Sequence, residues 1–122
     1  MFRRPIVLAA LIMSGVASLL AVPGAAQRAK PPGADYVGAA FTFTRIQAGI
    51  YHAVGTGAVS VGCNASVIVN QDEVMIVDSH ASPAAAWALM EELKAITPKA
   101  VRVVVNTHFH WDHAHGNQVY GP

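Results

Sequence analysis

The chain has 122 residues, 53% of them hydrophobic and 12% charged, with a formal net charge of +1 at pH 7. This length suits one small domain, and a charge so near zero lacks the basic face that a nucleic-acid-binding protein needs. We therefore expect no nucleic-acid partner. Cys63 is the only cysteine, which excludes an internal disulfide, and we expect it to be a small buried apolar side chain.

Residues 1–26 have the three-part layout of a secretory signal peptide. Arg3 and Arg4 precede an apolar run over 6–22, and small residues follow. We expect cleavage after Ala26, which reduces the eight Lys and Arg to six against seven Asp and Glu, a net charge of −1. The protein is then expected to be periplasmic or secreted, and to meet the membrane only in transit. An uncleaved anchor is the alternative, since about 17 apolar residues reach the lower limit for a membrane span.

Residues 27–40 contain two prolines and two glycines without apolar periodicity, which indicates a linker leading into a domain over 41–122. The domain begins with apolar and β-branched runs separated by turn residues, a pattern typical of short strands. The last two of these runs are separated by four polar residues and are expected to form a hairpin. The predicted strands cover residues 41–46, 50–54, 64–69 and 74–77.

A helix is predicted from Pro83 to about Ile96. Ser82 is suited to accept a hydrogen bond from a free N–H of the first turn, and Pro83 loses nothing at the first helical position. An apolar stripe at helical spacing is expected to face the core, namely Ala86, Leu89, Met90, Leu93 and Ile96. The charged residues Glu91, Glu92 and Lys94 are expected to face outward. The β-branched run 101–105 then predicts a strand that is covered on both faces.

Strand, helix and strand follow one another between Val74 and Val105, which predicts a parallel pair of strands with a crossover helix. In such sheets ligands bind at the carboxyl ends of the strands. Asp78 follows the first strand directly, and the polar residues 106–108 follow the second. Two separate segments are therefore expected to bring metal-binding side chains to one edge of the sheet.

Histidine is concentrated in one short run, because four of the six histidines lie between His108 and His115. Imidazole and carboxylate are ligands that suit zinc and similar divalent metals. Alternate residues of an extended segment point the same way, so His108, His110 and Asp112 can converge on one side, and a turn would bring His113 to a second metal. A histidine-rich surface loop is the alternative. The run is not repetitive and follows a strand, which favours metal binding.

The motif His108-x-His110-x-Asp112-His113 resembles the signature of the metallo-β-lactamase superfamily. The predicted strand that ends before Asp78 is similar to the strand that precedes this motif in the family. The resemblance implies an α/β fold, an αββα sandwich with a dinuclear site between its two sheets. The metals are usually two zinc ions, with iron or manganese as the alternatives.

By this resemblance, His108 and His110 would hold the first ion, and Asp112 and His113 the second. Asp112 would also orient the nucleophile, and Asp78 would support the metal loop from behind, as carboxylates outside the ligand shell do. The family's remaining ligands are a third histidine, a bridging aspartate and a final histidine, and all three come from a second half. We therefore expect this chain to be the amino-terminal half of such a domain.

The resemblance extends from Ile46 to Gly121, with one departure. Many members of the family have glycine at the position of His115. We interpret His115, and also His80 two residues beyond Asp78, as part of a polar rim or as a loop hydrogen bond. His52 lies in a predicted strand and is not expected to be a ligand.

The expected function is hydrolysis of a small-molecule ester, thioester or amide by hydroxide that two metal ions make available near neutral pH. A tryptophan at the position of Trp111 makes the motif resemble that of the hydroxyacylglutathione hydrolases, which favours a thioester substrate. Export instead favours a periplasmic role such as β-lactam hydrolysis. A true β-lactamase is the alternative among hydrolases. A non-catalytic metal-binding protein is the alternative from another class.

Overall fold

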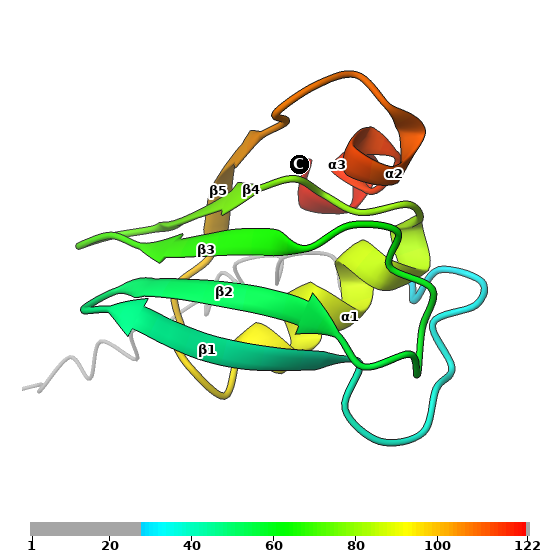
Figure 1. Cartoon of the computed structure of the whole chain (residues 1–122), viewed down its shortest axis with the longest axis horizontal. Coiled ribbons are helices and arrows are strands. Elements are labelled where there is room, and N and C mark those ends of the chain that lie inside the picture. Colours follow the sequence, from blue (N-terminus) through cyan, green and yellow to red (C-terminus); the bar gives the residue numbers. More distant parts are fainter. Residues whose placement is uncertain (1–27, 122) are drawn as a thin grey trace, which may run out of the picture.

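The computed structural model describes residues 28–121, which form a five-stranded sheet with helices packed on one face (Figure 1). The expected signal peptide lies outside this range. The strands stand in chain order across the sheet as β1 (Phe41–Gln47), β2 (Ile50–Gly55), β3 (Ala65–Val69), β4 (Val74–Val77) and β5 (Val101–Val105). The helices are α1 (Pro83–Leu93), α2 (Trp111–Ala114) and α3 (Asn117–Tyr120). None of these three helices could cross a membrane, given their lengths and composition.

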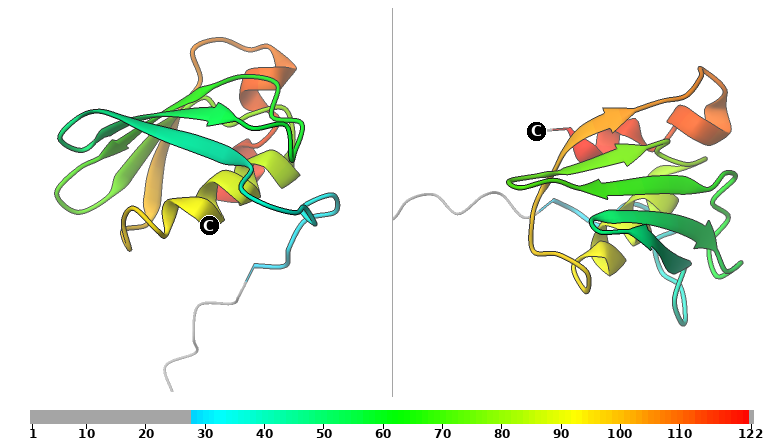
Figure 2. Two further views of the ribbon diagram at one scale, coloured as in Figure 1. Left: turned by 60° about the horizontal axis from the view of Figure 1, so that its bottom comes forward. Right: turned by 60° about the vertical axis from the view of Figure 1, so that its left-hand side comes forward.

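The strand pairing confirms the predicted topology. The pairs β1–β2, β2–β3 and β3–β4 are antiparallel, and β3–β4 is the expected hairpin, in which Ser66 lies opposite Val77. Strands β4 and β5 pair in parallel, with Val77 beside Val105, and α1 connects them (Figure 2). The carboxyl ends of β4 and β5 therefore meet at one edge of the sheet, as the sequence indicated.

Helix α1 begins as predicted. The Ser82 hydroxyl accepts a hydrogen bond from Ala85 N at 3.2 Å, and Pro83 occupies the first helical position. The helix ends at Leu93, three residues before the expected end, because the amides of residues 94–96 bond to carbonyls three residues back rather than four. This tighter turn is a common way for helices to end.

The core lies between the sheet and α1, where Val67, Ile76 and Leu89 are completely buried. The expectation that β5 is covered on both faces is wrong for the described residues. Strand β5 is at the edge of the sheet, and Val105 remains 44% exposed. The helices cover only one face of the sheet here. A run of β-branched residues indicates a strand, but it does not show whether one or both faces of that strand are covered.

Glu92 faces inward, which corrects the expectation that it faces solvent. Its carboxylate accepts hydrogen bonds from Ala40 N at 2.6 Å, Phe41 N at 3.0 Å and the Tyr36 hydroxyl at 3.0 Å. Burial and the nearby Glu92 carboxylate raise the pKa of Tyr36 to about 12. Glu92 thereby joins the residues before β1 to α1, and the apolar spacing of the helix did not indicate this role.

Candidate metal centre

The residues expected to bind metal lie at the edge where β4 and β5 end. Asp78 follows β4 directly, and its backbone N–H donates to Val105 O at 2.8 Å, so the two strands stay together to their last residues. Residues 106–110 leave β5 as a bent loop and lead into α2 (Figure 1). The expectation that one extended segment carries His108, His110 and Asp112 is therefore wrong, because Asp112 lies in α2. The structure therefore brings Asp78 and the histidine-rich run to one place, as predicted.

The Asp78 carboxylate joins these two segments. It accepts hydrogen bonds from Thr107 N at 2.8 Å and from the Thr107 hydroxyl at 2.9 Å, and its Oδ2 lies 2.9 Å from His113 Nδ1. Burial acts to raise the pKa of Asp78, but the hydrogen bonds from Thr107 and His113 outweigh it and hold the pKa below its usual value. A carboxylate that accepts several hydrogen bonds stays ionised, which suits it to orient a cationic or metal-bound neighbour.

The backbone of Asp78 is strained as well, with φ at 68°. His80, two residues later, has φ at 72°. Non-glycine residues adopt this left-handed conformation rarely and at a cost, and such residues are often found at functional sites. The strain coincides with the turn that carries Asp78 to the edge of the sheet.

The four predicted ligands lie close to one another. The ring centroid of His108 is 4.5 Å from that of His110 and 4.1 Å from that of His113. Asp112 Oδ2 lies 3.5 Å from His113 Nε2. His108 and His110 are exposed, while the side chains of His113 and Asp112 keep 20% and 29% of their surface. The cluster is therefore accessible from solvent.

His113 and His108 each donate a hydrogen bond from Nδ1, which leaves Nε2 of each ring as the nitrogen that can coordinate a metal. Nδ1 of His113 faces the ionised Asp78, which only accepts hydrogen bonds. Nδ1 of His108 lies 3.0 Å from the Thr107 hydroxyl, which has already donated its proton to Asp78 and so accepts here. Fixing the tautomer in this way is what partners of metal-binding histidines do.

The donor set fits zinc in its chemistry, since it combines imidazole nitrogens with a carboxylate. Within residues 28–121, no group of three or more His, Cys, Asp and Glu side chains is arranged to hold one ion. The family resemblance divides the expected ligands into two pairs, His108 with His110 and Asp112 with His113, although the ring of His108 lies nearer to that of His113 than to that of His110. A zinc ion takes four ligands, so each pair would supply only part of a shell.

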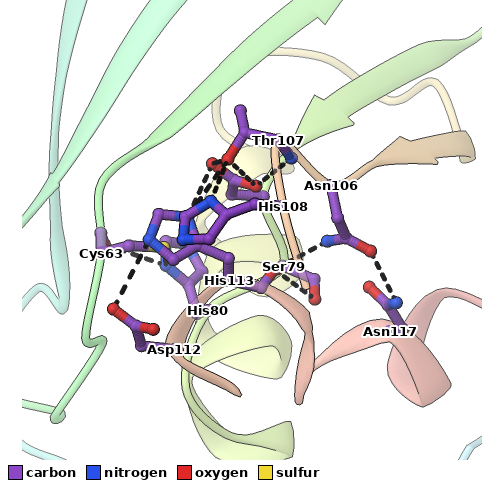
Figure 3. A network of polar contacts seen from close by, with 10 residues as sticks. Cys63, Ser79, His80, Asn106, Thr107, His108, Asp112, His113 and Asn117 are labelled. Atoms are coloured by element: carbon purple, nitrogen blue, oxygen red, sulfur yellow. Dashed lines mark hydrogen bonds and ion pairs between the residues drawn. The ribbon is translucent and has the colours of Figure 1, made fainter. Parts of the chain in front are cut away.

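Helix α2 is attached to the sheet edge through the carbonyl of His113. This oxygen accepts hydrogen bonds from Asn106 Nδ2 at 2.7 Å, Ser79 N at 2.8 Å and Ser79 Oγ at 3.2 Å (Figure 3). Asn117 Nδ2 in turn donates to Asn106 Oδ1 at 2.7 Å. The sequence indicated Asn106 only as one of the polar residues after a strand and indicated no role for Ser79 or Asn117, because nothing in their spacing points to a shared acceptor.

Gly116 permits this close approach. A Cβ atom at this position would lie 1.9 Å from Ser79 O and 2.6 Å from the Ala86 side chain. The Gly116 N–H also donates to His80 O at 3.2 Å. The segment between α2 and α3 therefore packs against the strained turn at 78–80 in a way that only glycine allows.

His80 is not part of a polar rim. It is completely buried, its ring centroid lies 4.9 Å from that of Phe41, and its Nδ1 lies 3.1 Å from Cys63 O. Of the two interpretations made from the sequence, the loop hydrogen bond is confirmed and the rim is wrong. Burial lowers the pKa of His80 to about 4, so the ring is neutral near pH 7.

Three further residues considered in the sequence, Cys63, His115 and His52, differ in their exposure and position. Cys63 is only partly buried, which corrects the expectation of a buried side chain, and burial raises the pKa of its thiol to about 11. His115 is exposed at the end of α2, with its ring 6.1 Å from that of Trp111. His52 lies in β2, the strand in which the sequence placed it.

Histidines and a carboxylate gathered beyond the end of β5, beside a buried aspartate at the end of β4, are the kind of side chains that metal-binding proteins use. The family model of the metallo-beta-lactamase superfamily matches residues 58–120, which is more than half of the chain. The chain belongs to this superfamily. The comparison with curated proteins found no match.

Solved structures with a similar fold are metallo-beta-lactamases. One is the enzyme FIM-1 from Pseudomonas aeruginosa in its mono-zinc form, at 24% identity and a TM-score of 0.55, over 65% of this chain and 37% of that one. Another, from Erythrobacter litoralis with beta mercaptoethanol in the active site, has 21% identity, a TM-score of 0.57 and coverage of 70% and 40%. A third, from Hirschia baltica, has 20% identity, a TM-score of 0.54 and coverage of 65% and 38%.

These identities show a shared fold. The present chain spans 40% or less of the length of each of these three structures. The five-stranded sheet with its helices is accordingly part of a metallo-β-lactamase fold, as the sequence predicted, and corresponds to its amino-terminal half.

Proposed function

We propose that the protein acts as an exported zinc hydrolase whose substrate carries an ester, thioester or amide bond. The observation that carries this proposal is the arrangement of His113. Its Nδ1 faces the buried Asp78 carboxylate, and its Nε2 faces Asp112 beside two further histidines. Imidazoles oriented by a carboxylate are characteristic of metal centres and have no evident use in a loop that only supports the fold.

Zinc is the proposed metal because the ligands are nitrogen and oxygen atoms, and because one similar structure is described as a mono-zinc form. We propose two ions per domain, His108 and His110 contributing to one and Asp112 and His113 to the other. Bound there, zinc would supply the Lewis acidity that lowers the pKa of water and polarises a carbonyl group. Iron or manganese would satisfy the same donor set less typically.

The side chains of the cluster then have separate tasks. Asp112, partly exposed and 3.5 Å from His113 Nε2, is placed to accept a hydrogen bond from an attacking water and to orient it. Asp78 keeps His113 in the tautomer that presents Nε2. Phe109 and Trp111 are 88% and 59% exposed beside the cluster and offer apolar surface to a small-molecule substrate.

Beta-lactam hydrolysis is the second candidate, favoured by the similar structures, which are all described as metallo-beta-lactamases. A metal-binding protein without catalysis is the candidate from another class. It would keep the same ligands but would have no need for Asp112 to remain accessible.

Elemental analysis combined with a substrate panel tests the proposal. The full-length protein is purified from its host, its zinc content is measured, and turnover of a thioester, an ester and a β-lactam is compared. The double substitution of His108 and His110 by alanine should remove metal and activity together, whereas His52→Ala, a change of one imidazole outside the cluster, should preserve both. Metal without turnover of any substrate would favour the non-catalytic alternative, and absence of metal would refute the proposal.

Export is tested separately. Mass spectrometry of the protein from its host should find an amino terminus at Gln27 in the periplasm or medium. Intact Met1 in the membrane fraction would instead show an uncleaved anchor.

A further inference from the structure

The carbonyl oxygen of His113 has an unusually complete set of donors. In a longer helix it would accept from an amide four residues on, but α2 ends at Ala114. It accepts instead from Asn106 Nδ2, from Ser79 N and from the Ser79 hydroxyl. A carbonyl has two lone pairs, so three donors saturate it. Three hydrogen bonds therefore hold the backbone of His113 in place.

The Asn106 amide contributes to this arrangement only in one orientation. Its NH₂ group must face the His113 carbonyl, because the reverse orientation would place two carbonyl oxygens together. Asn117 selects the favourable orientation, since its own NH₂ group donates to Asn106 Oδ1 at 2.7 Å. Asn117 is the first residue of α3 and follows Gly116, which packs against Ser79.

We propose that Asn117 is a positioning residue for the metal centre, acting through the Asn106 amide on the backbone of His113. The proposal rests on the proposed function, because it assigns to this relay the placement of a metal ligand. The competing interpretation is an exposed polar pair with no effect beyond an ordinary surface hydrogen bond. The two interpretations differ in how a carboxylate at position 117 should change the affinity for the metal ion.

The decisive comparison is between Asn117→Asp and Asn117→Ala in the full-length protein. Aspartate accepts hydrogen bonds and donates none, so it attracts the Asn106 NH₂ group and turns Asn106 Oδ1 towards the His113 carbonyl. Alanine merely releases Asn106. The aspartate variant should therefore bind the second metal ion about tenfold more weakly than the alanine variant, within the range known for residues that orient ligands. Competition titration with cobalt(II) gives the affinities, and the visible cobalt spectrum reports the geometry.

Two controls separate the relay from simple charge. Gln118→Asp and Gln118→Ala place the same pair of side chains one residue further on, at an exposed position of α3, and should bind cobalt equally. In an Asn106→Ala background, Asn117→Asp and Asn117→Ala should also become equal, since the intermediate amide is gone. A difference that persists without Asn106 would overturn the relay, as would equal affinities in the presence of Asn106.

A metal-free measurement keeps this inference distinct from the proposed function. In ¹⁵N spectra of the metal-free protein, the Asn106 side-chain amide and the Ser79 backbone amide should both shift in Asn117→Asp, and the shift should be larger than in Asn117→Ala. Unchanged signals would refute the relay even if metal binds. If the unmodified protein shows these contacts but takes up no cobalt, the proposed function fails, and with it the role of Asn117 in metal binding.

Discussion

Oδ2 of Asp78 lies 2.9 Å from Nδ1 of His113, although 35 positions separate the two residues in the sequence. The contact connects the end of β4 to α2 and turns the imidazole so that Nε2 faces Asp112. Because the Asp78 side chain is only 8% exposed, its charge is poorly screened by water and acts strongly on the ring. One buried carboxylate thus determines the orientation of the His113 ring, which we propose as a metal ligand.

Asp78→Asn tests this relationship without altering the backbone, since asparagine tolerates the left-handed conformation at φ 68°. Loss of the charge should weaken zinc binding by about 10- to 100-fold and destabilise the metal-free protein by roughly 1–3 kcal/mol. Zinc competition and denaturant unfolding measure the two effects. Asp72→Asn, in the exposed turn between β3 and β4, is the matched control. Unchanged zinc affinity in Asp78→Asn would show that the contact is structurally incidental.

Gly116→Ala should destabilise the protein by about 3 kcal/mol or more, because overpacking against rigid backbone cannot be relieved by a rotamer change. The new Cβ would lie 1.9 Å from Ser79 O. Gly121→Ala is the control, since its Cβ would meet nothing closer than 3.9 Å. Thermal unfolding compares the two variants. Equal stability would mean that the segment between α2 and α3 packs less tightly than the structure shows.

Glu92→Ala should cost about 2 kcal/mol, because it leaves the N–H groups of Ala40 and Phe41 without their acceptor in a partly buried place. Glu91→Ala removes the neighbouring carboxylate, which forms an exposed ion pair with Lys94, and should cost less than about 1 kcal/mol. Urea unfolding of both variants gives the difference directly. A larger loss for Glu91→Ala would contradict the assigned roles.

The sequence predicted the strands, the crossover helix and the clustering of the His and Asp side chains at the sheet edge because each has a short-range pattern. Alternation and β-branching identify strands, and Ser82-Pro83 identifies the start of α1. Contacts between distant residues have no such pattern. The inward turn of Glu92 depends on backbone groups about 50 residues away, and the burial of His80 depends on the ring of Phe41. For the same reason, the motif indicated the proposed ligands but not the roles of Ser79 and Asn106, which bond to the carbonyl of His113.

His80 should make stability depend on pH in the acidic range. Its pKa is lowered by burial from 6.5 to about 4, so between these values the unfolded chain binds a proton that the folded chain does not. Stability is therefore fully present above pH 6.5 and falls as the pH drops towards 4, by up to roughly 3 kcal/mol.

Urea unfolding of the metal-free protein across this range, in the presence of a chelator, measures the effect. His80→Asn suits the left-handed backbone and cannot titrate, so it should be less stable at pH 7 but should show a smaller slope with pH. His52→Asn, the same change in β2, should leave the slope as it is in the unmodified protein. An equal slope in His80→Asn would place the acid sensitivity elsewhere.

Asp112 distinguishes a catalytic centre from a site that only stores or binds metal. If it contributes to the second ion and orients the attacking water, Asp112→Asn in the full-length protein should retain most of the metal at the His108–His110 pair. Catalysis should fall by several orders of magnitude, because placement of the nucleophile and lowering of its proton affinity are each worth about two powers of ten.

His115→Gly should leave the metal content unchanged and alter turnover only modestly, since His115 is exposed at the end of α2. Metal analysis and turnover of thioester, ester and β-lactam substrates compare the two variants. Near-normal turnover in Asp112→Asn would rule out the assigned role, and loss of metal in His115→Gly would identify His115 as a ligand.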